Sequence, residues 1–125
     1  MAEVLVRDET MAGKAIETWI LPDLPDEITA RELLRLRIRD EVARHNAAPA
    51  PVFRGLVSPP TPHPTVGTQR RIDWTAQADA ACAAFAHNAF VMIVGASQVE
   101  ELDQVIDLRS DPTVAFIRLV PLVGG

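Results

Sequence analysis

Alternating apolar and polar residues at the start of the chain predict two β-strands. The first spans residues 3–7 (EVLVR) and the second spans residues 15–21 (AIETWIL). Residues 8–14 (DETMAGK) lie between them and have the composition of a turn, so we expect a hairpin. In the second strand, Trp19 and Ile20 are expected to enter the core.

A capping box at Thr29 and Glu32 predicts the start of the first helix, because each side chain can satisfy a backbone N–H group of the other residue. The helix is expected to end near His45 and Asn46. Its apolar face is expected to comprise Leu33, Leu34, Leu36, Ile38 and Val42. Its opposite face is expected to comprise Arg31, Arg35, Arg39 and Arg44. We interpret these arginines as a solvated surface rather than as a phosphate site.

Residues 47–71 interrupt this regular pattern and are rich in proline. The entropy of loop closure grows slowly with length, so a long loop costs only about 1 kcal/mol more than a short one. We therefore expect an irregular insertion, part of which is pinned to the body of the protein by Val52, Phe53 and Leu56.

The alanine-rich residues 73–88 predict a second helix that begins at Asp73 or Thr75. The residues expected to pack inward are Trp74, Ala81 and Phe85. Cys82 lies in the middle of this helix among alanines. We interpret it as a small buried apolar side chain rather than as a reactive thiol.

Three segments of the remaining chain are predicted to be extended. Residues 90–94 (FVMIV) are wholly apolar, which is typical of a central strand covered on at least one face. Residues 99–108 are expected to form a short edge segment and a 3₁₀ turn. Residues 114–120 read as a final buried strand.

Composition fits one globular domain spanning residues 1–125, with 48% hydrophobic and 23% charged residues. No apolar run approaches the ~20 residues that cross a bilayer, and the N-terminus lacks the features of an export signal. The single cysteine fits a reducing cytoplasm. A net charge of −5 argues against nucleic acid as the main partner. We expect a cytoplasmic protein that binds neither membrane nor nucleic acid.

The C-terminal segment, residues 113–125 (TVAFIRLVPLVGG), joins a strand to a proline and a diglycine. Pro121 ends the hydrogen-bond ladder because it has no backbone N–H. Gly124 and Gly125 have no Cβ, so they can lie extended in a narrow enzyme channel. We expect residues 121–125 to form an exposed tail whose carboxylate is the substrate of another enzyme. The alternative is that the glycines are a frayed end of the chain.

The second half of the chain resembles the β-grasp superfamily of ubiquitin-like proteins and sulfur carriers, such as the molybdopterin-synthase small subunit and the thiamine sulfur carrier. The resemblance is carried by residues 90–95 (FVMIVG), residues 99–102 (VEEL) and residues 113–125, including Pro121 and the diglycine. The proline-rich residues 47–71 depart from the small members of both families.

The resemblance implies an α+β, β-grasp (ubiquitin-like) fold. In this fold a mixed sheet carries a helix packed across one face, and the first and last strands lie parallel at its centre. The insertion and the second helix would be additions to it.

The sequence has no Gly-rich phosphate loop, no Ser-His-Asp or Cys-His arrangement and no His or Cys pair at metal-ligand spacing, so we expect no enzyme, no catalytic residue and no metal site. The resemblance implies that the chain binds no cofactor of its own. An E1-like adenylating enzyme, of the type that serves the sulfur carriers, would use ATP and magnesium to activate Gly124 and Gly125. Residues expected to contact this enzyme or a downstream acceptor are Arg7, Arg118, Val120, Pro121, Leu122 and Val123.

Three functions fit these expectations. The first is a ubiquitin-like modifier whose terminal glycine passes to a thiol and then to an amine of a target protein. The second is a sulfur carrier with a C-terminal thiocarboxylate, which Pro121 and the short Val-Gly-Gly end favour slightly. The third is an interaction subunit whose tail is never conjugated.

Overall fold

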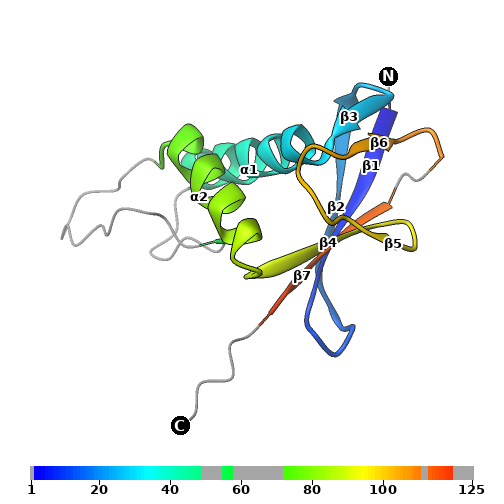
Figure 1. The fold of residues 1–125 in the computed structure, drawn as a ribbon. Helices are drawn as coiled ribbons and strands as arrows, with labels where there is room; N and C mark the ends of the chain where they lie inside the picture. The colour runs from blue at the N-terminus through cyan, green and yellow to red at the C-terminus, as the bar shows by residue number, and fades with distance from the viewer. Residues whose placement is uncertain (1, 49–54, 58–71, 111–112, 120–125) are drawn as a thin grey trace, which may run out of the picture.

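The residues that the structure describes form an α+β fold with a mixed five-stranded sheet, a second sheet of two strands, and two helices (Figure 1). The computed structural model describes residues 2–48, 55–57, 72–110 and 113–119. In chain order the elements are β1 (Ala2–Glu9), β2 (Ala15–Leu24), β3 (Glu27–Thr29), α1 (Ala30–Ala47), α2 (Trp74–Ala86), β4 (Phe90–Val94), β5 (Ser97–Gln98), β6 (Val105–Asp107) and β7 (Thr113–Arg118).

The strand order of the large sheet is β2-β1-β7-β4-β5, so the first and last strands lie side by side near its centre. They run parallel, with a register that extends from Leu5 opposite Thr113 to Glu9 opposite Ile117. A parallel pair requires a long connection across one face of the sheet. Here the connection contains α1 and α2, and both helices lie on the same side of the sheet (Figure 1). The expected parallel pairing of the first and last strands is confirmed.

The predicted hairpin is confirmed, although both strands are longer than expected. Asp8 and Glu9, which we assigned to the turn, belong to β1 instead. The turn closes at Gly13, whose φ of +81° suits a residue without Cβ. At the other end, β2 continues through Pro22. Proline is tolerated there because β2 is an edge strand, where a missing N–H need not break the ladder.

The core lies between the sheet and α1. Alternate residues of β1, β4 and β7 face the helix and are buried: Val4, Val6, Phe90, Met92, Val114 and Phe116. The facing residues of α1 are buried as predicted: Leu33, Leu34, Ile38 and Val42. The expected burial of Leu36 is only partial. This packing fixes α1 across one face of the sheet.

Trp19 and Ile20 cannot both enter this core, because successive strand residues point to opposite faces. Trp19 pairs with Val6, shares its inward face and is partly buried. Ile20 pairs with Leu5 on the other face and is 56% exposed. The prediction for Ile20 was therefore wrong.

Both helices begin as predicted. The Thr29 hydroxyl accepts a hydrogen bond from the Glu32 N–H at 3.1 Å, which is one half of the capping box. The Asp73 carboxylate accepts from the Thr75 N–H at 3.1 Å and caps α2. Ala81 is buried, whereas Cys82 is only partly buried.

The predicted short segment within residues 99–108 is present as β6, but it does not join the large sheet. It pairs antiparallel with β3 and forms the two-stranded sheet. The N–H of Ala30 donates to the carbonyl of Gln104 at 2.9 Å, which ties the start of α1 to this segment. Residues 111–112 of the predicted turn before β7 lie outside the described residues.

Candidate functional site

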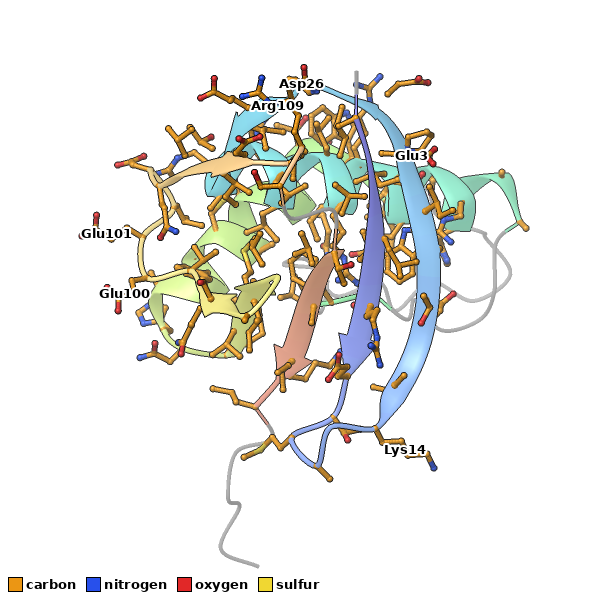
Figure 2. The ribbon with its side chains drawn as sticks, turned by 90° about the vertical axis from the view of Figure 1, so that its right-hand side faces the viewer. Glu3, Lys14, Asp26, Glu100, Glu101 and Arg109 are labelled. Atoms are coloured by element: carbon orange, nitrogen blue, oxygen red, sulfur yellow. The ribbon has the colours of Figure 1, made fainter. Side chains whose placement is uncertain are left out.

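The sheet face opposite the helices presents an apolar surface. Figure 2 views the protein from this side, with β1, β2 and β7 in front of the helices. The register places Arg7 beside Ala115 and Val91 beside Ile117 on this open face. All four residues are partly exposed. An exposed apolar face of this kind is typical of a surface that contacts another protein.

Arg7 and Arg118, which we expected to contact the same partner, lie on opposite faces of the sheet. Arg7 lies on the open face, where its Nε is 3.5 Å from the Glu9 carboxylate. Arg118 pairs with the buried residue Phe90 and shares its face, which is the one toward the helices. A single partner surface laid flat on the open face would therefore reach Arg7 but not Arg118.

Arg118 is tied to the insertion at the point where β7 ends. Its Nη2 donates to the Gly55 carbonyl at 2.9 Å, and its Nε is buried without a hydrogen-bond partner among the described residues. The next residue, Leu119, donates its N–H to the Ala89 carbonyl at 3.0 Å. These bonds hold the end of the strand against the insertion and the loop before β4.

Residues 55–57 form a strap, which is the part of the predicted insertion (residues 47–71) that the structure describes beyond the end of α1 and its C-cap at Ala48. Leu56 is buried, which confirms its predicted role, and its N–H donates to the Glu41 carboxylate at 3.2 Å. The Gln77 side-chain amide donates to the Val57 carbonyl at 2.6 Å. The strap thus bridges α1, α2 and the end of β7. Val52 and Phe53 lie outside the described residues.

A buried ion-pair network lies beneath the sheet, and the sequence analysis missed it. Arg37 is 1% exposed and bonds both carboxylate oxygens of Asp8, at 2.6 and 2.8 Å, as well as Glu41 at 3.1 Å. Its guanidinium carbon lies 4.5 Å from the ring centroid of Phe116 and 5.1 Å from that of Trp19. The feature of the sequence that points to this network is Arg37, which stands within the apolar stripe of α1 and four residues before Glu41.

Two groups of this network, Arg37 and Glu41, have shifted pKa values. Burial alone would lower the pKa of Arg37, but its bonds to Asp8 and Glu41 outweigh burial and raise it. Burial raises the pKa of the Glu41 carboxyl, and the neighbouring Arg37 only partly offsets this effect. Glu41 joins Arg37 to the strap, so the network connects β1, α1 and the strap.

The remaining predicted site residues are Val120, Pro121, Leu122, Val123, Gly124 and Gly125. All six lie outside the described residues, so the structure places only Arg7 and Arg118 of the predicted set.

Cys82 is the one cysteine of the chain, and it does not have the character of an activated nucleophile. Burial raises the pKa of its thiol, although Arg31 and Arg35 oppose the rise. Within the described ranges, no cluster of three or more His, Cys, Asp or Glu side chains could hold a metal ion. Neither described helix is long and apolar enough to cross a membrane.

Comparison with known proteins gave no relative for this chain: no protein-family model, curated protein or solved structure matches it.

Proposed function

We propose that the chain is a ubiquitin-like protein modifier with a β-grasp fold. The observation that carries the proposal is the parallel pairing of β1 with β7, with α1 packed across one face of the same sheet. In a β-grasp domain this arrangement directs the last strand outward from the centre of the sheet. Here that strand leads into the predicted tail and its diglycine.

The proposed reaction takes place on the Gly125 carboxylate. A carboxylate oxygen attacks the α-phosphorus of ATP, pyrophosphate leaves, and a glycyl adenylate forms. A thiolate of the activating enzyme then displaces AMP to give a thioester. A target amine finally displaces the thiolate and forms an amide. ATP and magnesium belong to the E1-like enzyme in this scheme.

The length and composition of the tail suit this chemistry. Six residues separate Leu119 from the Gly125 carboxyl group, and a chain of six residues spans at most about 20 Å. Gly124 and Gly125 offer no side chain that would block a narrow channel. The carboxylate could therefore enter an active site while the folded domain remains outside.

The open face of the sheet is the proposed docking surface for the E1-like enzyme. It presents Arg7, Ala115 and Ile117 beside one another on the strands β1 and β7. Arg118 lies on the other face and is bonded to Gly55, so we assign it a positioning role at the base of the tail rather than a contact with that enzyme.

A tryptic digest of proteins from the host organism tests the proposal. Trypsin cuts after Arg118, so a conjugated target would carry residues 119–125 (LVPLVGG) as a branch on a lysine. Cells that express the protein should yield such branched peptides. Cells that express a variant lacking Gly125 should yield none. Branches that persist without Gly125 would refute the proposal.

The sulfur-carrier function is the second candidate, because Pro121 and the short Val-Gly-Gly end favour it. A sulfur carrier would have a thiocarboxylate in place of the carboxylate at the end of its C-terminal peptide, which makes that peptide heavier by about 16 Da. Methionine oxidation elsewhere in the chain gives a similar shift, so the added mass must be located on the C-terminal peptide. A tail that is only ever found free and unmodified would favour an interaction subunit that is never conjugated.

A further inference from the structure

The strap at residues 55–57 is hydrogen-bonded to the rest of the described chain through side chains. Each strap residue bonds to one side chain, and the three side chains belong to different elements: Glu41 to α1, Gln77 to α2 and Arg118 to β7. Within the described ranges, the strap forms no backbone–backbone hydrogen bond. Its docking therefore depends on these three side chains and on the burial of Leu56, and not on a strand ladder or a helix.

Opposing contributions act on the docked strap. Burial of the Leu56 side chain favours docking, because it removes apolar surface from water. Two buried polar atoms on the side chains that hold the strap, Gln77 Oε1 and Arg118 Nε, have no hydrogen-bond partner among the described residues. Such unpaired atoms oppose burial, and release of the strap would give them access to water. The docked and released strap are therefore closer in free energy than the two states of a segment in a ladder.

The strap also lies on a continuous path of hydrogen bonds between the two central strands. Asp8 of β1 is bonded to Arg37, Arg37 to Glu41, and Glu41 to the strap. The strap is bonded in turn to Arg118 at the end of β7. Asp8 lies opposite Phe116 in the sheet, two residues before Arg118. The strap thus closes a ring of polar contacts beside the C-terminal end of β7.

We propose that the strap is a latch that holds the end of β7. In the docked state, Arg118 is bonded to Gly55 and the Leu119 N–H is bonded to the Ala89 carbonyl, so the last residues of the strand are fixed. In the released state, Arg118 loses its bond to the strap and the strand frays from this residue. The consequence for conjugation rests on the proposed function, in which the latch fixes the point from which the diglycine is presented.

Native-state hydrogen exchange of the Leu119 N–H in the purified full chain tests the latch. Leu56→Ala weakens the docking of the strap, so protection of Leu119 should fall at least about tenfold relative to that of the Ala30 N–H. Ala30 bonds to the Gln104 carbonyl at the start of α1 and serves as the internal control for global destabilisation. An equal fall at both amides, or a wild-type Leu119 that exchanges like an unstructured amide, would overturn the proposal.

Coupling between the strap and the strand must act in both directions. Arg118→Met removes the bond to Gly55 and leaves Leu56 in place, so the Leu56 N–H should exchange at least about tenfold faster. The matched control is Arg109→Met, which removes an exposed arginine bonded to Asp107 and should leave the Leu56 rate unchanged. Equal Leu56 rates in the two variants would contradict the latch. If one of the variants Leu56→Ala and Arg118→Met does not fold, the other still decides the question.

Failure of the latch and failure of the proposed function can be told apart. The exchange experiments need no activating enzyme and no target protein. If exchange shows the coupling and host cells yield no branched peptides, the latch stands and the modifier function is refuted. If branched peptides are found and exchange shows no coupling, the latch alone is refuted.

Discussion

Arg37 of α1 and Asp8 of β1 form a two-pronged ion pair in the core, with N–O distances of 2.6 and 2.8 Å. Asp8 lies in the strand that pairs with β7, and Arg37 lies against the Phe116 ring of β7. The pair therefore connects the helix to both central strands. It sits beneath the strand that leads to the tail.

Arg37→Met should destabilise the protein by about 3–5 kcal/mol, because Asp8 and Glu41 would be left buried without a positive partner. Urea unfolding measures this change. The matched control is Arg39→Met, which removes an exposed arginine from the same helix and should cost less than about 1 kcal/mol. Equal losses in the two variants would contradict the assigned role of the buried pair.

Glu41 should give the protein an unusual pH dependence. Burial raises the pKa of its carboxyl in the folded state above that in the unfolded chain. The folded state therefore binds the proton more tightly, and the contribution of Glu41 to stability is present at low pH and lost as pH rises through the folded pKa. The free energy of unfolding of wild type minus that of Glu41→Gln should increase as the pH falls from about 7 to about 4.5.

The contribution of Asp107 to stability should change with pH in the opposite direction to that of Glu41. Hydrogen bonds from Arg109 lower the pKa of this exposed carboxyl in the folded state. The contribution of Asp107 to stability is present when the pH lies above the pKa of this carboxyl in the unfolded chain. It is lost as the pH falls through the lower pKa of the folded state. The difference in unfolding free energy between wild type and Asp107→Asn should therefore shrink in acid below about pH 4. If the stability contributions of Glu41 and Asp107 changed in the same direction with pH, that result would contradict the two pKa shifts.

Leu56→Ala should destabilise the protein by about 2–5 kcal/mol, because this side chain anchors the strap in the core. Met11→Ala removes a comparable side chain from an exposed turn and should change the free energy of unfolding by less than about 0.5 kcal/mol. Denaturant unfolding of both variants checks the difference. A neutral Leu56→Ala would mean that the strap is not held by packing.

Deletion of Gly125, or Gly124→Trp, should shift the midpoint of thermal unfolding by less than about 2 °C, because the tail is proposed to lie outside the folded core. Phe116→Ala, in the strand that precedes the tail, should instead cost about 3–5 kcal/mol. A large thermal shift on removal of Gly125 would mean that the tail is packed into the fold.

Local patterns in the sequence predicted most of the described elements. The hairpin, the Thr29 cap, the alanine-rich helix and the apolar strand at residues 90–94 all depend on neighbours along the chain. They could be predicted because alternation, capping and turn residues act over a few positions. The parallel pairing of the first and last strands was predicted from the family resemblance and not from the hydrophobic periodicity of the sequence.

Features that depend on distant contacts were missed. The exposure of Ile20 follows from its register against Leu5, and the pairing of β6 with β3 joins a segment before α1 to one after β5. The burial of Arg37 requires Asp8, which lies 29 residues earlier in the chain. Arg37 stands within the apolar stripe of α1, but charge alone indicates a surface residue, so this local signal is not enough to predict its burial without knowledge of Asp8.

The most direct test of the central claim is a search for branched peptides in host cells that express the protein or its form without Gly125. If the Gly125 carboxylate is activated and transferred, lysines of other proteins carry residues 119–125 after trypsin digestion, and the truncated form yields none. If the C-terminal peptide is recovered only in its free form while the protein is abundant, the chain is not a protein modifier.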